Sequence, residues 1–448
     1  MKKNSKILSV DLDGTLIKSD MFYETFWSSF SNDLLIPLKV LFALFKGKGY
    51  IKKMLFNLSS IDIGSLPYNS DVIDYINEHR SNGGKVVLVT SSTQKVADAV
   101  SNHLNLFDEV YGSTSEINLK GLAKANLQKK VFGNKNFDYI GNSLSDLQTW
   151  EISNKAITFN ADKNLKRKCE FINENTLHLV GQKKNSFLNN VFKEIRAYQW
   201  IKNILVFIPL IAAQEFDKAN FFQASLAFIA FSSTASSAYL FNDLLDIKSD
   251  RNHQKKCRRP LAAGHLSFSA GSLLGILLFL LGLTLGFAVG KSFLAVLLTY
   301  YAITISYSVY LKKKALVDIF TLSGLYTLRL FAGAVATNLN ISLWLLAFSI
   351  FIFLSLAAIK RQSELIDLIN SGKDNLMKRG YKKCDLDFIR TLAISSGLIS
   401  TLILALYINS PKVLDLYSNP KFLWVSCSLF LFWLTRVFFK TNRGEMEY

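Results

Sequence analysis

The chain has 448 residues, half of them hydrophobic, and a formal net charge of +18. This length exceeds one ordinary core, so we expect two domains. Its four cysteines lack paired spacing, which argues against both a disulfide framework and a zinc site. We attribute the positive charge to membrane topology and anionic lipids, because no basic module or stacking pattern typical of nucleic-acid binding is present.

Composition divides the chain near residue 185. Residues 1–185 are polar with short apolar runs, whereas residues 200–440 are dominated by apolar runs of about membrane-spanning length. We therefore predict a soluble domain over residues 1–185 and a membrane domain over residues 186–448. The polar, turn-prone stretch 181–186 is the expected linker.

Strands alternate with helices in the soluble domain. This alternation predicts a parallel α/β sheet whose ligands bind at the carboxyl ends of the strands. Asp11, Thr90 and Gly141 stand at such ends. The expected strands are residues 6–11, 86–90, 108–111, 137–141 and 156–159, and the expected helices include residues 72–80 and 94–103.

The first predicted strand ends in the motif Asp11-Leu-Asp13-Gly14-Thr15. In this motif, and in the ordered Thr, Lys and acidic elements after it, residues 6–160 resemble the haloacid dehalogenase superfamily of phosphotransferases. The resemblance implies a Rossmann-like α/β domain with a small helical cap. It implies that Asp11 is the nucleophile that forms an aspartyl-phosphate and that Asp13 is the general acid/base. Such a reaction needs two nearby carboxylates, one to attack and one to protonate the leaving oxygen.

The same resemblance assigns residues that hold the phosphate. Thr90, or Ser91 beside it, matches the family's phosphate-binding hydroxyl. Lys124 matches the lysine that neutralises the phosphoryl group and the nucleophile, with Lys120 as the alternative.

The last acidic motif of this family is present in altered form. The family usually has GDxxxD, whereas this chain has Gly141-Asn142-Ser-Leu-Ser-Asp146. Asp11, Asp13 and Asp146 are therefore the expected Mg²⁺ ligands, and Asn142 removes one carboxylate from the usual set. Two interpretations stay open, an active phosphatase with a weaker metal site and a catalytically quiet relative.

Residues 20–70 lie where this family often inserts a cap that controls substrate access. Within them, the apolar run Leu34–Phe45 is too short to span a membrane. It is either the core of a cap helix or part of a cap that dips into the bilayer to meet a lipid-linked substrate.

The second half of the chain predicts an all-α, polytopic membrane domain. Eight apolar runs have the required character, and the short first and long fifth runs leave room for nine helices. The runs are residues 201–214, 221–241, 269–288, 291–310, 315–336, 342–359, 388–409 and 421–438.

Charge in the short loops predicts the orientation of these spans. The loops after the second, fourth and sixth spans hold most of the Lys and Arg residues, so the positive-inside rule places them in the cytoplasm. The apolar run Ile7–Val10 is too short for a signal peptide. We therefore expect an integral protein of a bacterial-type inner (plasma) membrane whose soluble domain and two termini are cytoplasmic.

Four polar residues crowd the end of the second apolar run. At about 100° per residue, Asn242, Asp243, Asp246 and Asp250 fit one arc of an α-helix continued from that run. Carboxylates at a membrane boundary are costly and usually functional. Because Mg²⁺ prefers hard oxygen ligands and often bridges carboxylates to substrate phosphates, the motif predicts a Mg²⁺-bound diphosphate.

This motif and its surroundings resemble the UbiA superfamily of intramembrane transferases, whose first signature is NDxxDxxxD. The resemblance covers roughly residues 193–440 and is strongest to the branch represented by decaprenyl-phosphate phosphoribosyltransferase. That branch extends the motif to DRxHPxKxxRPxAxG, with Gln254 replacing the usual proline here. The matching positions are Arg196–Asn203, then Asp250, Arg251, His253, Lys256, Arg259, Pro260 and Gly264, then Tyr307–Lys312, Asp318 and Leu328–Ala334.

The resemblance implies transfer of 5-phosphoribose from phosphoribosyl diphosphate to a polyprenyl phosphate. Aromatic prenyltransferases of the superfamily usually carry a second DxxxD for a second Mg²⁺, whereas this chain has Lys312, Lys313 and a single Asp318 there. More cations and fewer acids suit two phosphorylated substrates. In either reaction, Mg²⁺ on the Asp motif would neutralise the departing diphosphate, and Asp243 and Asp246 are the expected catalytic residues.

Basic and polar residues near the motif are the expected phosphate ligands. For phosphoribosyl diphosphate they are Gln199, Lys202, Arg251, Lys256 and Arg259. For the lipid phosphate they are Lys312, Arg329, Lys360 and Arg361. His253 is expected to be a positioning hydrogen-bond donor rather than a base.

Two rival interpretations stay open. One is a prenyltransferase that alkylates an aromatic or other small acceptor. The other is a transporter or scaffold whose soluble domain senses phosphorylated ligands, although neither repeated halves nor mid-membrane ionisable residues are evident. The preferred hypothesis is a bifunctional enzyme whose soluble half hydrolyses a phosphate, most simply the 5-phosphate of the lipid-linked phosphoribose. The polyprenyl length and the oligomeric state do not follow from the residues.

Overall fold

The computed structural model describes residues 7–114, 117–181, 186–370, 380–410, 413 and 420–446. Most of the expected linker 181–186 lies outside these residues, as does much of the basic loop after the sixth predicted span. Contacts divide the chain into two compact units, residues 1–195 with 243–274, and residues 196–242 with 275–448. The first unit thus includes part of the second half of the chain, and the predicted domain limits at 185 and 186 stay predictions.

The first unit is built on a six-stranded, wholly parallel sheet. Its strand order is β3-β2-β1-β4-β5-β6. The predicted α/β fold is confirmed, and β6 is an edge strand that the sequence did not predict. The strands are β1 (Ile7–Val10), β2 (Lys85–Thr93), β3 (Glu109–Ser113), β4 (Asp138–Gly141), β5 (Ala156–Phe159) and β6 (Thr176–Leu179).

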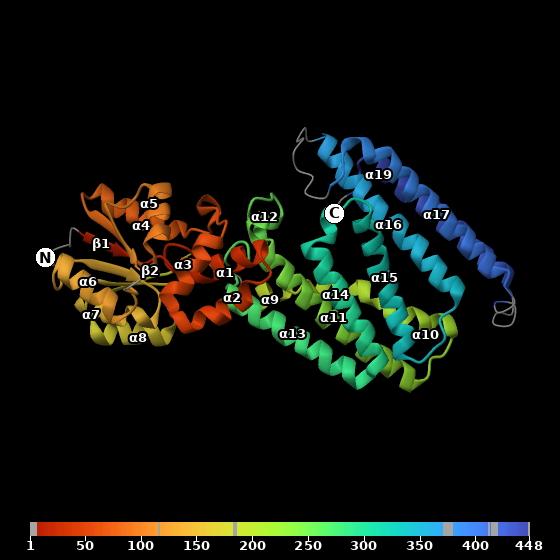
Figure 1. Ribbon diagram of the computed structural model, residues 1–448, viewed down its shortest axis with the longest axis horizontal. Helices are drawn as coiled ribbons and strands as arrows, with labels where there is room; N and C mark the ends of the chain where they lie inside the picture. The colour runs from red at the N-terminus through yellow and green to blue at the C-terminus, as the bar shows by residue number, and fades with distance from the viewer. Residues whose placement is uncertain are drawn as a thin grey trace. The chain divides into compact units, whose positions relative to one another are not determined.

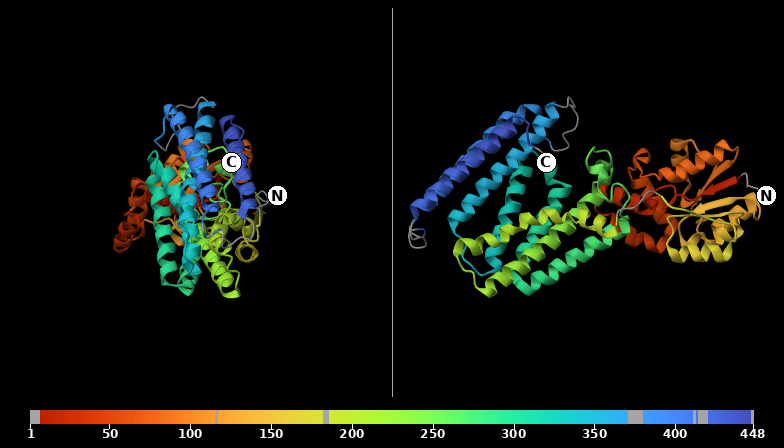
Figure 2. Two further views of the ribbon diagram at one scale, coloured as in Figure 1. Left: turned by 90° about the vertical axis from the view of Figure 1, so that its right-hand side faces the viewer. Right: turned by 180° about the vertical axis from the view of Figure 1, so that it is seen from behind.

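Helices cover both faces of the sheet, as Figures 1 and 2 show. One face carries α4 (Ser70–Ser81) and α5 (Gln94–Leu104), whose Val72, Ile76 and Val96 join the larger core. The other face carries α6 (Leu122–Phe132), α7 (Leu147–Ile152) and α8 (Lys163–Ile172). Because both faces are covered, the buried residues of the central strands β1, β2 and β4 are mostly apolar.

The cap lies between β1 and β2 in the chain. It consists of α1 (Met21–Asn32), α2 (Ile36–Ala43), the short helix η1 (Leu44–Lys46), α3 (Lys48–Leu58) and η2 (Ile63–Ser65). Ile36 and Ala43 of α2 pack on Ile51 and Leu55 of α3. Most other apolar side chains of α2 and η1 are exposed, so the run Leu34–Phe45 does not form a closed cap core.

A second segment of the chain completes the first unit. This segment, residues 243–274, contains the end of α11 (Lys218–Leu245), α12 (Ile247–Arg251), η5 (Lys256–Arg258) and the start of α13 (Phe268–Val289), whereas α9 (Phe187–Glu194) closes the first segment. Gly264 permits the close approach of this loop to Lys18 and Pro67. Its φ is +71°, and a Cβ there would lie 2.7 Å from Cβ of Lys18.

The second unit is all-α, as predicted. Seven helices among the described residues are long and apolar enough to cross a membrane. The first predicted span is instead the short pair η4 (Ala197–Phe207) and α10 (Ile208–Ala213), so the count of eight is not confirmed. The other helices are α14 (Lys291–Val309), η6 (Leu311–Lys313), α15 (Val317–Ala336), α16 (Leu343–Asn370), η7 (Lys383–Asp385), α17 (Leu386–Ile408), η8 (Pro420–Phe422) and α19 (Leu423–Asn442).

Candidate functional site

Lys124 binds the predicted nucleophile at the carboxyl edge of the sheet. Its Nζ lies 2.6 Å from Oδ1 of Asp11 and 3.7 Å from Oδ1 of Asp146, and all three side chains are buried. Lys120, the alternative, is exposed. Burial raises the pKa of Asp11 to about 6, Lys124 opposes the rise and Asp146 adds to it. The lysine therefore favours the charged form of a buried carboxylate, which the predicted nucleophile requires.

Asp146 holds the loop that follows β4. Tyr139 donates its hydroxyl to Oδ1 at 2.7 Å, and Oδ2 accepts the backbone N–H groups of Asn142 and Ser143 at 3.1 and 2.9 Å. The hydroxyl of Ser143 also donates to Oδ2. These bonds give Asp146 a positioning role beside Lys124, and its binding of Mg²⁺ stays a prediction.

Asp13 is anchored by the cap and by the end of β2. It accepts the backbone N–H of Met21 at 2.8 Å and the hydroxyl of Ser92 at 3.0 Å. Burial, with Asp20 and Asp11 nearby, raises the pKa of Asp13 to about 7. A carboxyl with such a pKa suits proton transfer near neutral pH.

The phosphate-binding hydroxyl predicted at Thr90 or Ser91 has a neighbour that the sequence did not identify. Thr90 is fully buried, and its Oγ1 accepts the N–H of Ser92 at 3.0 Å. Because β2 runs on to Thr93 rather than ending at Thr90, it is Ser92 whose side chain contacts Asp13.

The cap contributes a lysine that the sequence analysis missed. Nζ of Lys52, on α3, donates to the carbonyl of Ser91 at 2.6 Å. Burial lowers the pKa of Lys52, while the nearby Asp13 and Asp20 raise it. A cap lysine near Asp13 and Asp20 is a candidate phosphate ligand. The sequence analysis missed it because no local pattern distinguishes Lys52 from the neighbouring Lys53.

Asn142 faces the nucleophile loop despite being an amide. A Cβ on Gly14, where φ is +74°, would lie 2.2 Å from Nδ2 of Asn142. Within the described residues, no three side chains of His, Cys, Asp or Glu converge as a metal site. The predicted ligands Asp11, Asp13 and Asp146 are carboxylates, hard donors of the type that Mg²⁺ prefers, and Asn142 leaves this set one carboxylate short of the usual one.

The Asp motif of the second half sits at a helix break. α11 ends at Leu245, Asp246 caps α12, and the N–H of Asp250 donates to the carbonyl of Asp246 at 2.9 Å. The continuous helix predicted from the spacing is thus interrupted at Asp246, although this bond keeps the helical pitch. Asp243 and Asp250 are buried, and Asn242 and Asp246 are half-buried.

Two carboxylates of this motif converge on one point. Nη1 of Arg259 lies 2.8 Å from Oδ1 of Asp243 and 2.5 Å from Oδ2 of Asp250. Burial raises the pKa of Asp250 to about 6, Arg259 opposes the rise and Asp243 adds to it. A divalent cation in the place of this nitrogen would meet the same two carboxylate oxygens, and such hard oxygen ligands suit Mg²⁺.

Lys256 and His253 flank the same loop. Nζ of Lys256 is 3.8 Å from Asp250 and substantially exposed, so it can turn toward an added phosphate. Nδ1 of His253 accepts the N–H groups of Lys255 and Lys256 at 3.2 and 3.4 Å. The positioning role predicted for His253 is therefore served by accepting rather than donating.

Arg251, a predicted phosphate ligand, has a protein partner. Its guanidinium donates twice to Glu24 of the cap helix α1, at 3.0 and 2.6 Å, and once to the carbonyl of Ala262 at 3.1 Å. Both charged side chains are nearly inaccessible, at 6% and 2% exposure. The arginine next to Asp250 therefore joins the Asp-motif loop to the cap.

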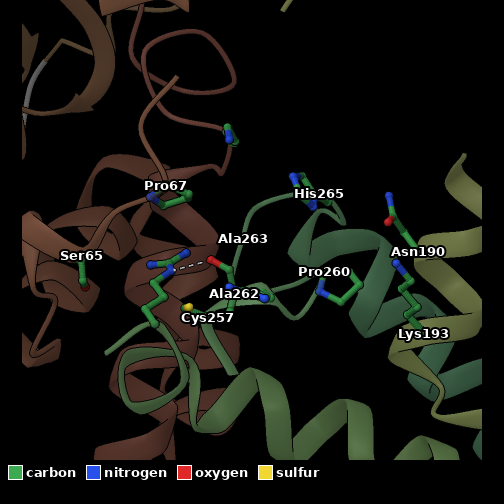
Figure 3. Close-up of a pocket in the computed structure, with 12 residues that line it drawn as sticks. Ser65, Pro67, Asn190, Lys193, Cys257, Pro260, Ala262, Ala263 and His265 are labelled. Atoms are coloured by element: carbon green, nitrogen blue, oxygen red, sulfur yellow. Dashed lines mark hydrogen bonds between the residues drawn. The ribbon is translucent and has the colours of Figure 1, made fainter. Parts of the chain in front are cut away.

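A groove of about 570 Å³ lies along this junction (Figure 3). Figure 3 shows Ala262 and Ala263 between Pro67 of the cap side and Pro260 of the loop. No carboxylate lines the groove, so it suits an anionic group. Its lining residues are Lys18, Ser65, Pro67, Asn190, Lys193, Arg251, Cys257, Arg258, Pro260, Ala262, Ala263 and His265.

Within the second unit, Arg329 is a buried cation in a helix interior. It lies twelve residues after the start of α15 and seven before its end, so the expectation that no ionisable residue lies inside a span is wrong. It donates to Asn203, to the carbonyl of Leu325 and to the Tyr300 hydroxyl, each at 2.8 Å. These partners are neutral, and such an intramembrane charge commonly marks a substrate path.

Asp318 stands where a second acidic motif would be, and it is fully enclosed. Its carboxylate accepts the guanidinium of Arg361 and the hydroxyl of Tyr381. Arg361 also donates to Glu364 and Tyr307. This engagement gives Asp318 and Arg361 a shared structural role, so Arg361 is a poor ligand for a lipid phosphate.

The remaining predicted ligands are accessible. Lys202 is half-buried and donates to Gln199 at 3.5 Å, and Gln199 donates to the hydroxyl of Tyr198 at 3.0 Å. Lys312 is half-buried in η6, and Lys360 is exposed on α16. Their binding of phosphates stays a prediction.

Comparison with known proteins places this architecture among relatives. Residues 204–443 match the UbiA prenyltransferase family. The protein y4nM of Sinorhizobium fredii is 32% identical over 98% of this chain and 85% of its own length, so the similarity includes both halves. The nodulation protein NoeC of Azorhizobium caulinodans is 33% identical over 56% of this chain and 82% of its own length. A decaprenyl-phosphate phosphoribosyltransferase of Mycolicibacterium smegmatis is 34% identical over 49% of this chain and 71% of its own length.

Replacing Lys52 tests the contribution of the cap to the first site. Lys52→Ala removes a cation that faces the Asp13 region, so hydrolysis of an aryl phosphate by the full-length protein should fall about tenfold or more, through KM and kcat together. Lys53→Ala, on the exposed side of α3, is the matched control and should keep the wild-type rate. Equal rates for both variants would contradict a role for Lys52.

The Glu24–Arg251 pair is tested by a double-mutant cycle. Because removing one partner leaves a buried charge unpaired, Glu24→Gln and Arg251→Gln should each destabilise the first unit by about 3–5 kcal/mol. The double variant should lose less than the sum of the two, since the partners interact. Thermal unfolding of the full-length protein in detergent measures this, and a loss equal to the sum would show that the pair does not interact.

Proposed function

The chain belongs to the UbiA prenyltransferase family, and we propose that its membrane half transfers 5-phosphoribose from phosphoribosyl diphosphate to a polyprenyl phosphate. It is an integral membrane protein, with seven long apolar helices among its described residues. The similarity to decaprenyl-phosphate phosphoribosyltransferases supports this choice of substrates.

The observation that carries the proposal is the convergence of Asp243 and Asp250 on a single nitrogen of Arg259. The Asp motif would then be the one acidic cluster that holds a diphosphate, in contrast to the two acidic motifs usual in aromatic prenyltransferases. The other acidic position, Asp318, is occupied by Arg361 and Tyr381. This arrangement favours a phosphoribosyl donor over the prenyl diphosphate of the alternative reaction.

The transfer is a substitution at C1 of the ribose. The C1–oxygen bond to diphosphate breaks, its electron pair leaves with the diphosphate, and an oxygen of the lipid phosphate forms the new bond to C1. Mg²⁺, held by Asn242, Asp243, Asp246 and Asp250, would supply charge neutralisation at the leaving group. Arg259 and Lys256 would then turn from the carboxylates to the phosphates. The attacking phosphate is already anionic, so no strong base is required.

The soluble half is proposed to remove the 5-phosphate from the lipid-linked product. Asp11 would attack the phosphorus to form an aspartyl-phosphate, and Asp13 would protonate the departing ribose oxygen. Water, deprotonated by Asp13, would then attack the same phosphorus, freeing Asp11 and releasing inorganic phosphate. Lys124 and Lys52 would balance the charge of the transferred phosphoryl group. The carboxylate-free groove beside Arg251 lies between the Asp-motif loop and the cap, where a phosphorylated head group can bind. We place this half on the cytoplasmic side of a bacterial inner membrane.

Purified protein in detergent, given Mg²⁺, ribose-labelled phosphoribosyl diphosphate and a polyprenyl phosphate, tests the transfer. Label should enter the lipid phase with the wild type and fall at least about a hundredfold with Asp243→Ala/Asp246→Ala, which removes two carboxylates of the motif. Asp217→Ala, an exposed acid outside the motif, should leave the rate unchanged. Consumption of a polyprenyl diphosphate with an aromatic acceptor, and no label in lipid, would establish the prenyltransferase instead.

A further inference from the structure

The cap exposes an apolar surface that the soluble core does not use. Within α2 and η1, only Ile36 and Ala43 are buried. Phe42 is 71% exposed and Phe45 is 92% exposed. The exposed side chains of this segment, named here the cap surface, are Leu34, Leu35, Leu38, Leu41, Phe42, Leu44 and Phe45. A contiguous group of this size on a water-facing domain indicates a binding surface.

Charge around the cap surface identifies its occupant. From residue 34 to residue 61 the chain has no Asp or Glu, and it has five lysines. Lys46, Lys48 and Lys53 are exposed, and Lys46 lies over the ring of Tyr50. Large apolar side chains with a lysine fringe match the acyl boundary and the anionic head groups of a bilayer.

The cap surface is mechanically connected to the phosphatase site. Ile36 and Ala43 of α2 pack against Ile51 and Leu55 of α3. Lys52, between those two α3 residues, donates to the carbonyl of Ser91 in the site. A helix that touches lipid therefore packs directly on the helix that carries a phosphate-facing lysine.

We propose that the cap surface binds the surface of the anionic bilayer and presents lipid-linked phosphate esters to the Asp11 site. This inference extends the proposed function, because it makes the substrate of the soluble half one that remains in the membrane. The bilayer is the partner the observations favour. A second copy of the chain is the competing occupant and is decided by the test.

Fluorescent labelling of the full-length protein in anionic nanodiscs tests the contact. A polarity-sensitive dye is attached at Phe45→Cys or at Phe171→Cys, in a Cys257→Ser/Cys384→Ser background. Phe171 is the matched control, since it is also a phenylalanine of the soluble half with 92% exposure. Spin-labelled lipids should quench the dye at position 45 at least about threefold more than at position 171. Equal quenching, or dye burial that follows protein concentration and ignores the lipid label, would overturn the proposal.

A second variant tests delivery of the substrate. Leu41→Ser/Phe42→Ser/Phe45→Ser changes only exposed side chains, so the fold should persist. Phosphate release from phosphoribosyl lipid in the nanodiscs should fall about tenfold, while hydrolysis of a soluble aryl phosphate stays unchanged. Unchanged release from the lipid would overturn delivery by the cap. If the wild type itself leaves the lipid untouched, the proposed function fails, whereas the quenching comparison still decides the membrane contact.

Discussion

A buried carboxylate is stabilised by a cation beside it, and three such arrangements lie at or next to the candidate sites. Lys124 faces Asp11 and Asp146, Arg259 bridges Asp243 and Asp250, and Arg251 holds Glu24. Removing a carboxylate from water is costly unless such a partner or a metal compensates. A cation therefore contacts a carboxylate at each of three places: the carboxyl edge of the sheet, the helix break after α11, and the junction between α12 and the cap.

The three pairs differ in what the cation can do next. Lys124 is held by Asp11 and the Tyr139 hydroxyl, so it stays in place while phosphate arrives. Arg259 has a quarter of its side chain exposed and contacts both carboxylates through the single nitrogen Nη1. It can therefore move to a diphosphate when a metal binds. Arg251 is enclosed, and its bidentate bond to Glu24 ties the Asp-motif loop to the cap within the first unit. That connection provides a physical reason for the two proposed activities to share one chain.

The sequence predicted the elements whose pattern is local. Five of the six strands were predicted from short apolar runs, because strands covered on both faces are mostly apolar. Seven spans were predicted from long apolar runs, because a helix that crosses the bilayer needs about 20 mostly apolar residues. β6 was missed because its residues are only partly buried at the edge of the sheet. The first predicted span, residues 201–214, is divided between η4 and α10, and Pro209 stands in the first turn of α10.

The candidate sites show the same division. Asp11, Asp13 and Lys124 were predicted from motif order, and their contacts agree with it. Lys52, Ser92 and Glu24 were not predicted, since each acts through a partner far along the chain and no periodicity connects residue 24 with residue 251. Arg251 and Arg361 were predicted as phosphate ligands, and each pairs with a carboxylate of the protein that the local sequence did not indicate. Their binding of phosphates stays a prediction.

The central claim is that one chain first makes and then dephosphorylates a phosphoribosyl lipid. The most direct measurement uses phosphoribosyl diphosphate with one radioactive label in the 5-phosphate and a different one in the ribose, supplied to the full-length protein with polyprenyl phosphate. The lipid should first carry both labels in the donor ratio and then lose the phosphate label while keeping the ribose label. Asp11→Asn should hold the ratio at the donor value. A ratio that never changes in the wild type would contradict the account.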